Sequence, residues 1–426
     1  MKIKFPYSNV RPLEIGLDVN VVQFALPKTN LTTVGAELVS HALRHPIGNV
    51  RLALKALDKK KIVIISDDIS RPTPTYEFIG LILDELHLSG VKDQNIDFLM
   101  ALGSHRPMTK KEMAVKLGAN ILTRFRVHNH EWDNQKCLKY IGDTNQGVPV
   151  SVNRLVSEAD LVIGLGAIMP IEVCGFSGGG KIVVPGVCGE NTNSEMHWAR
   201  VKVPSNQILG KRDNPIRKSI DSLAKKAGLD YIVNVILDEN NKIAGAVAGD
   251  VVAAHRAGCK IAKKVYGVKV SKEFDIVIAD SFPFDIEFWQ ANKALDTTGV
   301  FVKKGGVVIL VSPCYEGFSK THSEILEFGY LPKETVKTLV KSGKINHKVV
   351  GVHMIQVAAV AIEKAKVILV SEGISKKDAE KVGLLWAQTP QKAFEMAVKF
   401  VKGKPRVAIL KQAARMLPIK DRSSAK

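Results

Sequence analysis

The feature that most constrains the fold of this chain is a repeated alternation of short apolar runs with helix-like stretches. Between residues 60 and 170, the runs IVIIS, IDFLMALG and LVIGLG are separated by helical patterns, such as the one from Tyr76 to Leu88. A second series begins near Phe274, with apolar runs at 276–281, 307–312, 349–354 and 367–373. Such alternation is typical of parallel sheets with helical connections. We therefore predict an α/β fold made of two α/β domains, with a strand at each run.

The domain boundary is predicted near residue 270. A helical pattern over 251–265 leads to the segment GVKVSKEF, which we interpret as a hinge. We expect an N-terminal domain over 1–270 and a C-terminal domain over 271–404, with the tail 405–426 returning to the first domain. Since ligands of parallel α/β sheets bind at the carboxyl ends of strands, we expect the active site in the cleft between the domains.

Charge and composition exclude several classes of protein. The formal charge of +19, from 61 Lys and Arg against 42 Asp and Glu, favours an anionic partner. Aromatic residues are only 6% and are not interleaved with basic ones, so we expect no nucleic acid partner. No run approaches the roughly 18–20 apolar residues of a membrane helix, and no apolar segment follows Lys2 and Lys4. The five scattered cysteines indicate reduced thiols. We expect a cytoplasmic protein with no membrane contact.

Titratable residues are concentrated directly after four of the apolar runs. The loops read DDISRPTP after the first run, SHRPMT after the second, GAIMPIEVCGFSGGGKIVVPG after the third and FPFDIEFWQANK after the run at 276–281. If these loops share one cleft, it would contain Asp67, Asp68, Arg71, His105, Arg106, Lys181, His197, Gln290 and Lys293.

The segment GFSGGGK, ending at Lys181, has two functional interpretations. It matches the first seven positions of the phosphate-binding pattern G-x-x-x-x-G-K-[ST], which would suit a nucleotide hydrolase. The eighth position is Ile182, which cannot bind magnesium, and Pro185 interrupts the helix that should follow. Alternatively, Lys181 is partly desolvated by the apolar residues after it and acts as a nucleophile or linkage point. A plain glycine-rich turn with an exposed lysine is the non-functional alternative.

These motifs together resemble the nickel-dependent lactate racemase family. The resemblance rests on DDISRP, SHRPMT, GFSGGGKIVVPGVCGE followed by HW, and WQANK, in the family's order over essentially the whole chain. It implies two α/β domains, a racemase or epimerase of a small-molecule 2-hydroxy acid, and proteins that supply the cofactor. That cofactor is nickel in a nickel pincer nucleotide (pyridinium-3,5-bisthiocarboxylic acid mononucleotide), covalently attached at Lys181. The implied roles are nickel binding by His197, cofactor contacts by Asp68 and Arg71, proton transfer by His105, and substrate binding by Gln290 and Lys293.

The residues themselves are compatible with these roles. A neutral imidazole at His197 is a good nickel ligand. The guanidinium of Arg71, in a Ser-Arg-Pro turn, suits a phosphate or carboxylate, although a surface arginine held by Asp67 or Asp68 has the same pattern. His105 suits a general base or an ordinary loop histidine. Gln290 and Lys293 are spaced to share a helix face, which is either a carboxylate clamp or ordinary surface.

The chain departs from the family at Ile171. The family has a second histidine ten residues before the lysine, and isoleucine cannot accept a proton. Glu172 and His353, the latter at the end of the predicted strand over 349–354, are candidates for the second base. Each also has an ordinary interpretation, as an exposed carboxylate and a buried imidazole. We expect a 2-hydroxy acid other than lactate, or slow turnover of lactate. A non-catalytic binder of the nucleotide or of an acidic metabolite is the alternative.

Overall fold

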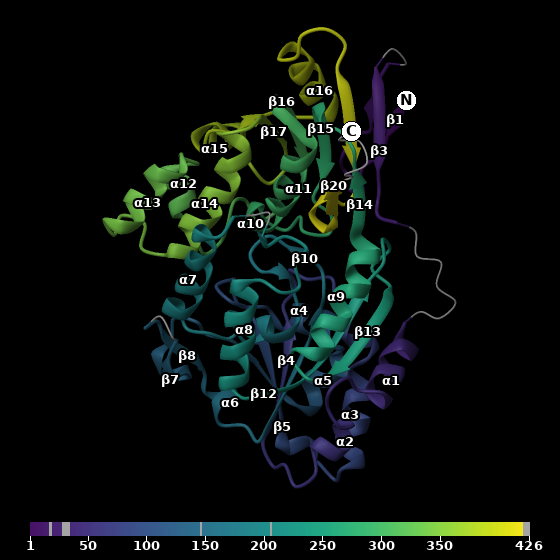
Figure 1. The fold of residues 1–426 in the computed structure, drawn as a ribbon, viewed down its shortest axis with the longest axis vertical. Helices are drawn as coiled ribbons and strands as arrows, with labels where there is room; N and C mark the ends of the chain where they lie inside the picture. Colours follow the sequence, from purple (N-terminus) through teal and green to yellow (C-terminus); the bar gives the residue numbers. More distant parts are fainter. Residues whose placement is uncertain (17–18, 28–34, 145–146, 205–206, 421–426) are drawn as a thin grey trace. The chain divides into compact units, whose positions relative to one another are not determined.

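The computed structural model describes residues 1–16, 19–27, 35–144, 147–204 and 207–420. The chain divides into two compact units. The central unit is formed by Lys28–Val265, and the terminal unit is formed by Met1–Pro27 together with Tyr266–Lys426. Each unit is built on a six-stranded sheet accompanied by helices (Figure 1). The predicted α/β fold class is therefore confirmed.

The sheet of the central unit has the strand order β13-β12-β9-β4-β5-β6. All neighbours are parallel except β13, which runs antiparallel to β12. The strands are β4 (Ile62–Asp67), β5 (Ile96–Ala101), β6 (Arg126–Asn129), β9 (Leu161–Ala167), β12 (Leu229–Leu237) and β13 (Ile243–Gly249). Strands β4, β5 and β9 lie at the three runs predicted from the sequence, and the carboxyl ends of β4 and β5 are adjacent because these strands are neighbours.

The continuous apolar character of these strands follows from burial on both faces. Every residue of β4 from Ile62 to Ser66 is buried, as is the whole of β9. The accompanying helices are α1 (Ala36–Arg44), α2 (Leu52–Lys55), α3 (Ile79–Leu88), α4 (Lys110–Leu117), α5 (Ala119–Arg124), α6 (Arg154–Ser157), α7 (Glu190–Trp198), α8 (Pro215–Lys226) and α9 (Ala253–Tyr266). Smaller antiparallel pairs are β7 (Leu138–Asp143) with β8 (Pro149–Asn153), and β10 (Pro170–Ile171) with β11 (Gly175–Phe176).

The sheet of the terminal unit is entirely parallel, with the order β18-β17-β16-β15-β19-β3. Its strands are β3 (Asn20–Phe24), β15 (Phe274–Asp280), β16 (Val302–Val311), β17 (Lys366–Val370), β18 (Leu385–Trp386) and β19 (Arg406–Leu410). Its helices are α10 (Phe288–Ala291), α11 (Lys293–Phe301), α12 (Glu324–Phe328), α13 (Lys333–Lys341), α14 (Lys348–Ala361), α15 (Lys376–Lys381) and α16 (Pro390–Lys399). The short pairs are β1 (Lys2–Ile3) with β2 (Leu13–Glu14), and β14 (Gly267–Val270) with β20 (Leu417–Lys420).

Both ends of the chain belong to the terminal unit, which differs from the predicted domains. β19 lies between β15 and β3, so the described part of the tail completes the second sheet and does not return to the first. Ile3, Tyr7 and Leu13 of the N-terminal segment pack in the same hydrophobic core as Ile276 and Val407. The predicted hinge contains strand β14, which pairs with β20. The tail prediction was wrong because the sequence pattern of a strand does not indicate which sheet it joins.

The apolar run at 349–354 is helical, which corrects the predicted strand. It forms part of α14, a 14-residue helix with nine buried residues, including His353. A buried helix and a buried strand are both continuously apolar over six residues, so the run alone does not separate them.

No helix in the described part of the chain is long and apolar enough to cross a membrane.

Candidate active site

A carboxylate–imidazole pair lies at the carboxyl edge of the central sheet. Asp68 follows β4 and His105 follows β5, and Nδ1 of His105 lies 2.5 Å from Oδ2 of Asp68. The other oxygen of Asp68 accepts hydrogen bonds from the hydroxyl of Ser70 at 2.5 Å and the amide of Ser70 at 3.2 Å. Burial acts to raise the pKa of Asp68, but His105 and Arg71 outweigh it and hold the pKa below the ordinary value. An ionised Asp68 therefore orients His105 with its Nε2 directed away from the pair.

The turn that carries Arg71 is fixed by a buried lysine that the sequence analysis missed. Nζ of Lys116 lies 2.6 Å from Oδ1 of Asp67 and donates to the carbonyl of Arg71 at 2.8 Å. Arg71 itself donates to the hydroxyl of Ser70 at 2.8 Å. Lys116 lies on the buried face of α4, with Met113 and Leu117. A lysine at this helical spacing among apolar residues was the available signal.

Lys181 lies in the short 3-10 helix η4 (Gly179–Ile182), and its side chain is half-buried. Burial lowers the pKa of Lys181 to about 8; Cys174 opposes this shift, and the charges of Arg71 and Arg217 reinforce it. Among the described residues, its amine makes no hydrogen bond or ion pair. The amine is thus partly desolvated, and its neutral form is favoured.

The glycines before Lys181 pack against the protein and do not form an open phosphate cradle. A Cβ on Gly179 would lie 2.8 Å from the ring of His255, and one on Gly180 would lie 2.9 Å from Ala224. Gly178 and Gly179 also have positive φ angles. η4 ends at Ile182, directly after the lysine, and the next helix is α7, which begins at Glu190. This geometry argues against the nucleotide hydrolase interpretation, which requires a helix N-terminus at the lysine.

His197 is fixed in one orientation by its own helix. It lies near the end of α7, and its Nδ1 is 2.9 Å from the carbonyl of Asn193. Because Nδ1 donates to that carbonyl, Nε2 carries the lone pair of the neutral ring. Burial and the neighbouring charge of Lys181 lower the pKa of His197 to about 4. The ring of His197 is therefore neutral at ordinary pH, with the lone pair of Nε2 able to bind a metal ion.

Five of the predicted residues lie together in the central unit. The charges of Arg71 and Asp68 act on the Lys181 amine, and those of Lys181 and His105 act on the ring of His197. Within the described residues, no group of three or more His, Cys, Asp or Glu side chains is arranged to hold a metal ion.

Gln290 and Lys293 lie in the terminal unit. They belong to α10 and the start of α11, and Nζ of Lys293 donates to Oε1 of Gln290. Gln290 is buried, whereas Lys293 is half-buried and its Nζ lies 5.1 Å from the centre of the Phe284 ring. The predicted spacing on one face is reproduced, and the two side chains form a unit that can donate hydrogen bonds to an anion.

His353 is also in the terminal unit, with both ring nitrogens engaged. Nδ2 of Asn292 donates to its Nδ1 at 3.0 Å and to the carbonyl of Trp289 at 2.6 Å, which fixes the amide orientation. Nε2 of His353 therefore donates to the hydroxyl of Tyr330, at 3.1 Å. The ring stacks on Trp289 with 4.4 Å between centroids. Burial lowers the pKa of His353 to about 3. These contacts are those of a neutral, packed imidazole.

Glu172 is buried and paired with an arginine. Its carboxylate accepts a hydrogen bond from Nη2 of Arg200, and Nε of Arg200 donates to the Glu172 carbonyl at 3.2 Å. Nη1 of Arg200 donates to the carbonyl of Val203 at 2.6 Å. Glu172 is therefore not an exposed loop carboxylate, and its charge is already compensated.

The two largely parallel sheets define a two-unit α/β protein. Its titratable residues lie at the carboxyl edge of one sheet, which is where such folds bind ligands. Two family models match the chain: the lactate racemase N-terminal domain over residues 9–209 and the lactate racemase C-terminal domain over residues 269–416. The chain belongs to the lactate racemase family, which confirms the resemblance stated above.

Individual relatives agree with this assignment. Lactate racemases from Thermoanaerobacterium thermosaccharolyticum and Lactiplantibacillus plantarum are each 34% identical over 284 residues, which is 66% of this chain and 66% of each relative. The structure of the lactate racemase apoprotein from T. thermosaccharolyticum matches 98% of this chain and 100% of its own, with a TM-score of 0.85 and 26% identity. A crystal structure of a Thermotoga maritima protein shares the fold, with a TM-score of 0.74, 23% identity, and coverage of 91% of this chain and 100% of its own.

Proposed function

We propose that this chain is an isomerase that racemises or epimerises a 2-hydroxy acid. The observation that carries the proposal is the Asp68–His105 pair beside Lys181 and His197 in a member of the lactate racemase family. This arrangement combines an oriented imidazole, a desolvated amine and a neutral nitrogen ligand. These are groups that the family resemblance implies in the central unit, where only the second histidine, at the position of Ile171, is missing.

The central-unit residues fit the cofactor that the resemblance implies. An amine with a pKa of about 8 has a substantial neutral fraction near neutral pH, as covalent attachment at Lys181 requires. The lone pair on Nε2 of His197 suits nickel, and the half-buried guanidinium of Arg71 suits the nucleotide phosphate. When bound, the nickel pincer nucleotide would supply reversible acceptance of the hydride from the substrate C2. The cofactor would be provided by separate biosynthetic proteins.

His105 is the proposed group for proton transfer. Asp68 binds its Nδ1, so Nε2 accepts the proton of the substrate hydroxyl and later returns it. The ionised Asp68 stabilises the imidazolium that forms in between, as the carboxylate of a catalytic triad does. Gln290 and Lys293 are proposed to bind the substrate carboxylate.

The second proton-transfer group remains a proposal with two candidates, His353 and Glu172. Both are engaged by other residues, His353 by Asn292 and Tyr330 and Glu172 by Arg200. Either would have to exchange its partner for substrate. The engagement of both candidates by other residues also favours the second candidate function. In that function the chain binds the nucleotide or an acidic metabolite and does not convert it.

The test uses protein produced in a host that makes the cofactor. Intact mass, peptide mapping of Lys181 and a nickel assay are followed by chiral chromatography of a panel of 2-hydroxy acids and sugar acids. We expect modified Lys181, nickel bound through His197 and inversion of at least one acid that is turned over faster than lactate. Modified protein that inverts no acid would favour the binder. Unmodified Lys181 without nickel from such a host would overturn the proposal.

A further inference from the structure

The loop that carries Lys181 is held by a fully buried arginine. Arg217 on α8 is 0% exposed. Its Nη2 donates to the carbonyl of Phe176, and its Nη1 donates to the carbonyl of Gly178 at 3.1 Å. The same Nη2 lies 3.2 Å from Sγ of Cys174. The guanidinium therefore contacts three residues of the segment that leads directly to Lys181.

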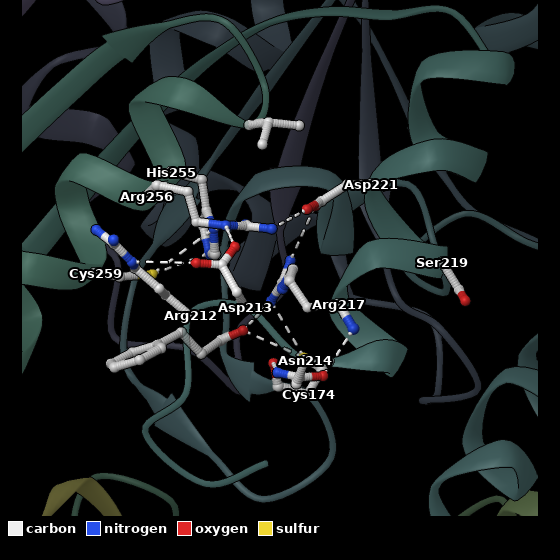
Figure 2. Close-up of polar contacts among 12 residues, drawn as sticks. Cys174, Arg212, Asp213, Asn214, Arg217, Ser219, Asp221, His255, Arg256 and Cys259 are labelled. Atoms are coloured by element: carbon white, nitrogen blue, oxygen red, sulfur yellow. Dashed lines mark hydrogen bonds and ion pairs between the residues drawn. The ribbon is translucent and has the colours of Figure 1, made fainter. Parts of the chain in front are cut away.

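A chain of ion pairs holds Arg217 in turn. Figure 2 shows Arg217 between Asp221 and Cys174, and Arg256 reaching both Asp221 and Asp213. Arg217 lies 3.7 Å from Oδ1 of Asp221, Arg256 lies 2.6 Å from the other oxygen, and Arg256 lies 2.7 Å from Asp213. Arg212 also lies 3.2 Å from Asp213, so three arginines and two aspartates form this network, and Asp221 compensates the buried guanidinium of Arg217 within it.

Two further side chains contact the same loop. Nε2 of His255 lies 2.9 Å from the carbonyl of Ser177, and Oδ1 of Asn234 accepts a hydrogen bond from the amide of Gly179 at 2.8 Å. Arg217 is distinct from them because it binds two carbonyls, one on either side of Ser177. Glycine peptides have wide conformational freedom, and Gly175, Gly178 and Gly179 all have positive φ angles. Such a loop keeps one conformation only if groups outside it bind its backbone.

We propose that Arg217 is a positioning residue for Lys181. The two terminal nitrogens of its planar guanidinium bind the carbonyls of Phe176 and Gly178 and thereby fix the loop. The amine of Lys181 is then presented in one place for covalent attachment. The attachment itself rests on the proposed function. Arg217→Lys retains the charge but is expected to bind only one of the two carbonyls, because the lysine amine lacks the planar guanidinium.

The first measurement is hydrogen exchange on cofactor-free protein, read on peptides that cover residues 175–182. Loss of hydrogen bonds from a charged group should raise local opening, and hence exchange, by about 10- to 100-fold in Arg217→Gln. Arg217→Lys should fall between that variant and wild type. The matched control is Arg415→Gln, since Arg415 is also fully buried but lies in the terminal unit against Gln412 and Tyr266. The control should leave exchange over 175–182 unchanged.

The second measurement is the fraction of Lys181 modified in the cofactor-producing host. We expect this fraction to fall at least about tenfold in Arg217→Gln and to be partly restored in Arg217→Lys. Unchanged exchange in folded Arg217→Gln overturns the inference. Faster exchange with wild-type modification overturns it as well, because Arg217 would then be only structural. If Arg217→Gln does not fold, Arg217→Lys is judged by the same criteria. If wild type is unmodified, the proposed function fails, and the exchange result alone decides whether Arg217 positions the loop.

Discussion

The 2.5 Å contact between Oδ2 of Asp68 and Nδ1 of His105 joins the loops after two neighbouring parallel strands. Ile65 of β4 pairs with Leu99 of β5, so the two strands end side by side. Two residues 37 positions apart in the sequence thereby form one hydrogen-bonded pair. Because the sheet register fixes both loops, the imidazole is oriented before any substrate binds.

The first prediction concerns this pair. Asp68→Asn should lower kcat about 10²- to 10⁴-fold, because the neutral amide cannot stabilise the imidazolium of His105. His105→Ala should be at least as severe. The measurement is kcat in both stereochemical directions, with Asp84→Asn, an exposed position on α3, as the control. Wild-type kcat in Asp68→Asn would show that the pair has no part in proton transfer.

The second prediction is a pH dependence of stability from His353. Its folded pKa of about 3 lies below the unfolded value of about 6.5, so the unfolded state binds more protons between these values. The free energy of unfolding should therefore rise with pH through this window and be independent of His353 above it. In His353→Phe, the slope between pH 4 and 6 should decrease by about 1.4 kcal/mol per pH unit. Denaturant titrations at several pH values measure it, with exposed His41→Gln as the control. An unchanged slope would contradict a buried neutral His353.

The residues that could be identified from the sequence differ physically from those that could not. Residues at the ends of strands, such as Asp68 and His105, could be found because parallel strands bring their carboxyl ends to one edge. The roles of the buried cations Lys116 and Arg217 could not be assigned from the sequence, because each also binds backbone carbonyls, those of Arg71 and Gly178, and such contacts leave no sequence signal. The fold class was predictable from the alternation of apolar runs alone.

The errors in the fold have related causes. The run at 349–354 continues as an apolar helix to Ala361, and only its length distinguishes it from a strand. The assignment of β19 and β3 to the second sheet depends on pairing between distant segments, which no local pattern records. The glycines before Lys181 match a phosphate-binding pattern in the sequence, whereas in the structure they allow His255 and Ala224 to pack closely.

The third prediction concerns Glu172. Removing one partner of a buried ion pair leaves the other charge unpaired, so Glu172→Gln should lower the free energy of unfolding by about 3–5 kcal/mol. The control is Glu158→Gln, whose pair with Arg154 is exposed and should contribute at most about 1 kcal/mol. Chemical denaturation measures both. If Glu172 is also the second base, the variant should impair one enantiomer much more than the other, and equal effects on both would exclude that role.

The fourth prediction concerns the substrate carboxylate. Lys293→Met removes a charged donor next to Gln290 and should raise KM about 10- to 100-fold without releasing the cofactor. Lys304→Met, an exposed lysine in β16, is the control. A neutral 2-hydroxy amide used as a competitive inhibitor should bind wild type and Lys293→Met equally. An unchanged KM for the acid would remove Lys293 from the proposed site.

The last prediction concerns Ile171, where the chain lacks the family's second histidine. Ile171 is half-buried in β10 and pairs with Gly175 of β11, which precedes the Lys181 loop by a few residues. In Ile171→His, an imidazole would stand where the family has one, so lactate racemisation should rise by at least about 10²-fold, the lower end of general base catalysis. Ile171→Gln, a polar side chain that does not titrate, should give no gain. Chiral chromatography of each lactate enantiomer measures both variants. Equal gains in the two variants would mean that polarity, and not a missing base, limits lactate turnover; fast racemisation of lactate by wild type would show that another residue already supplies the second base.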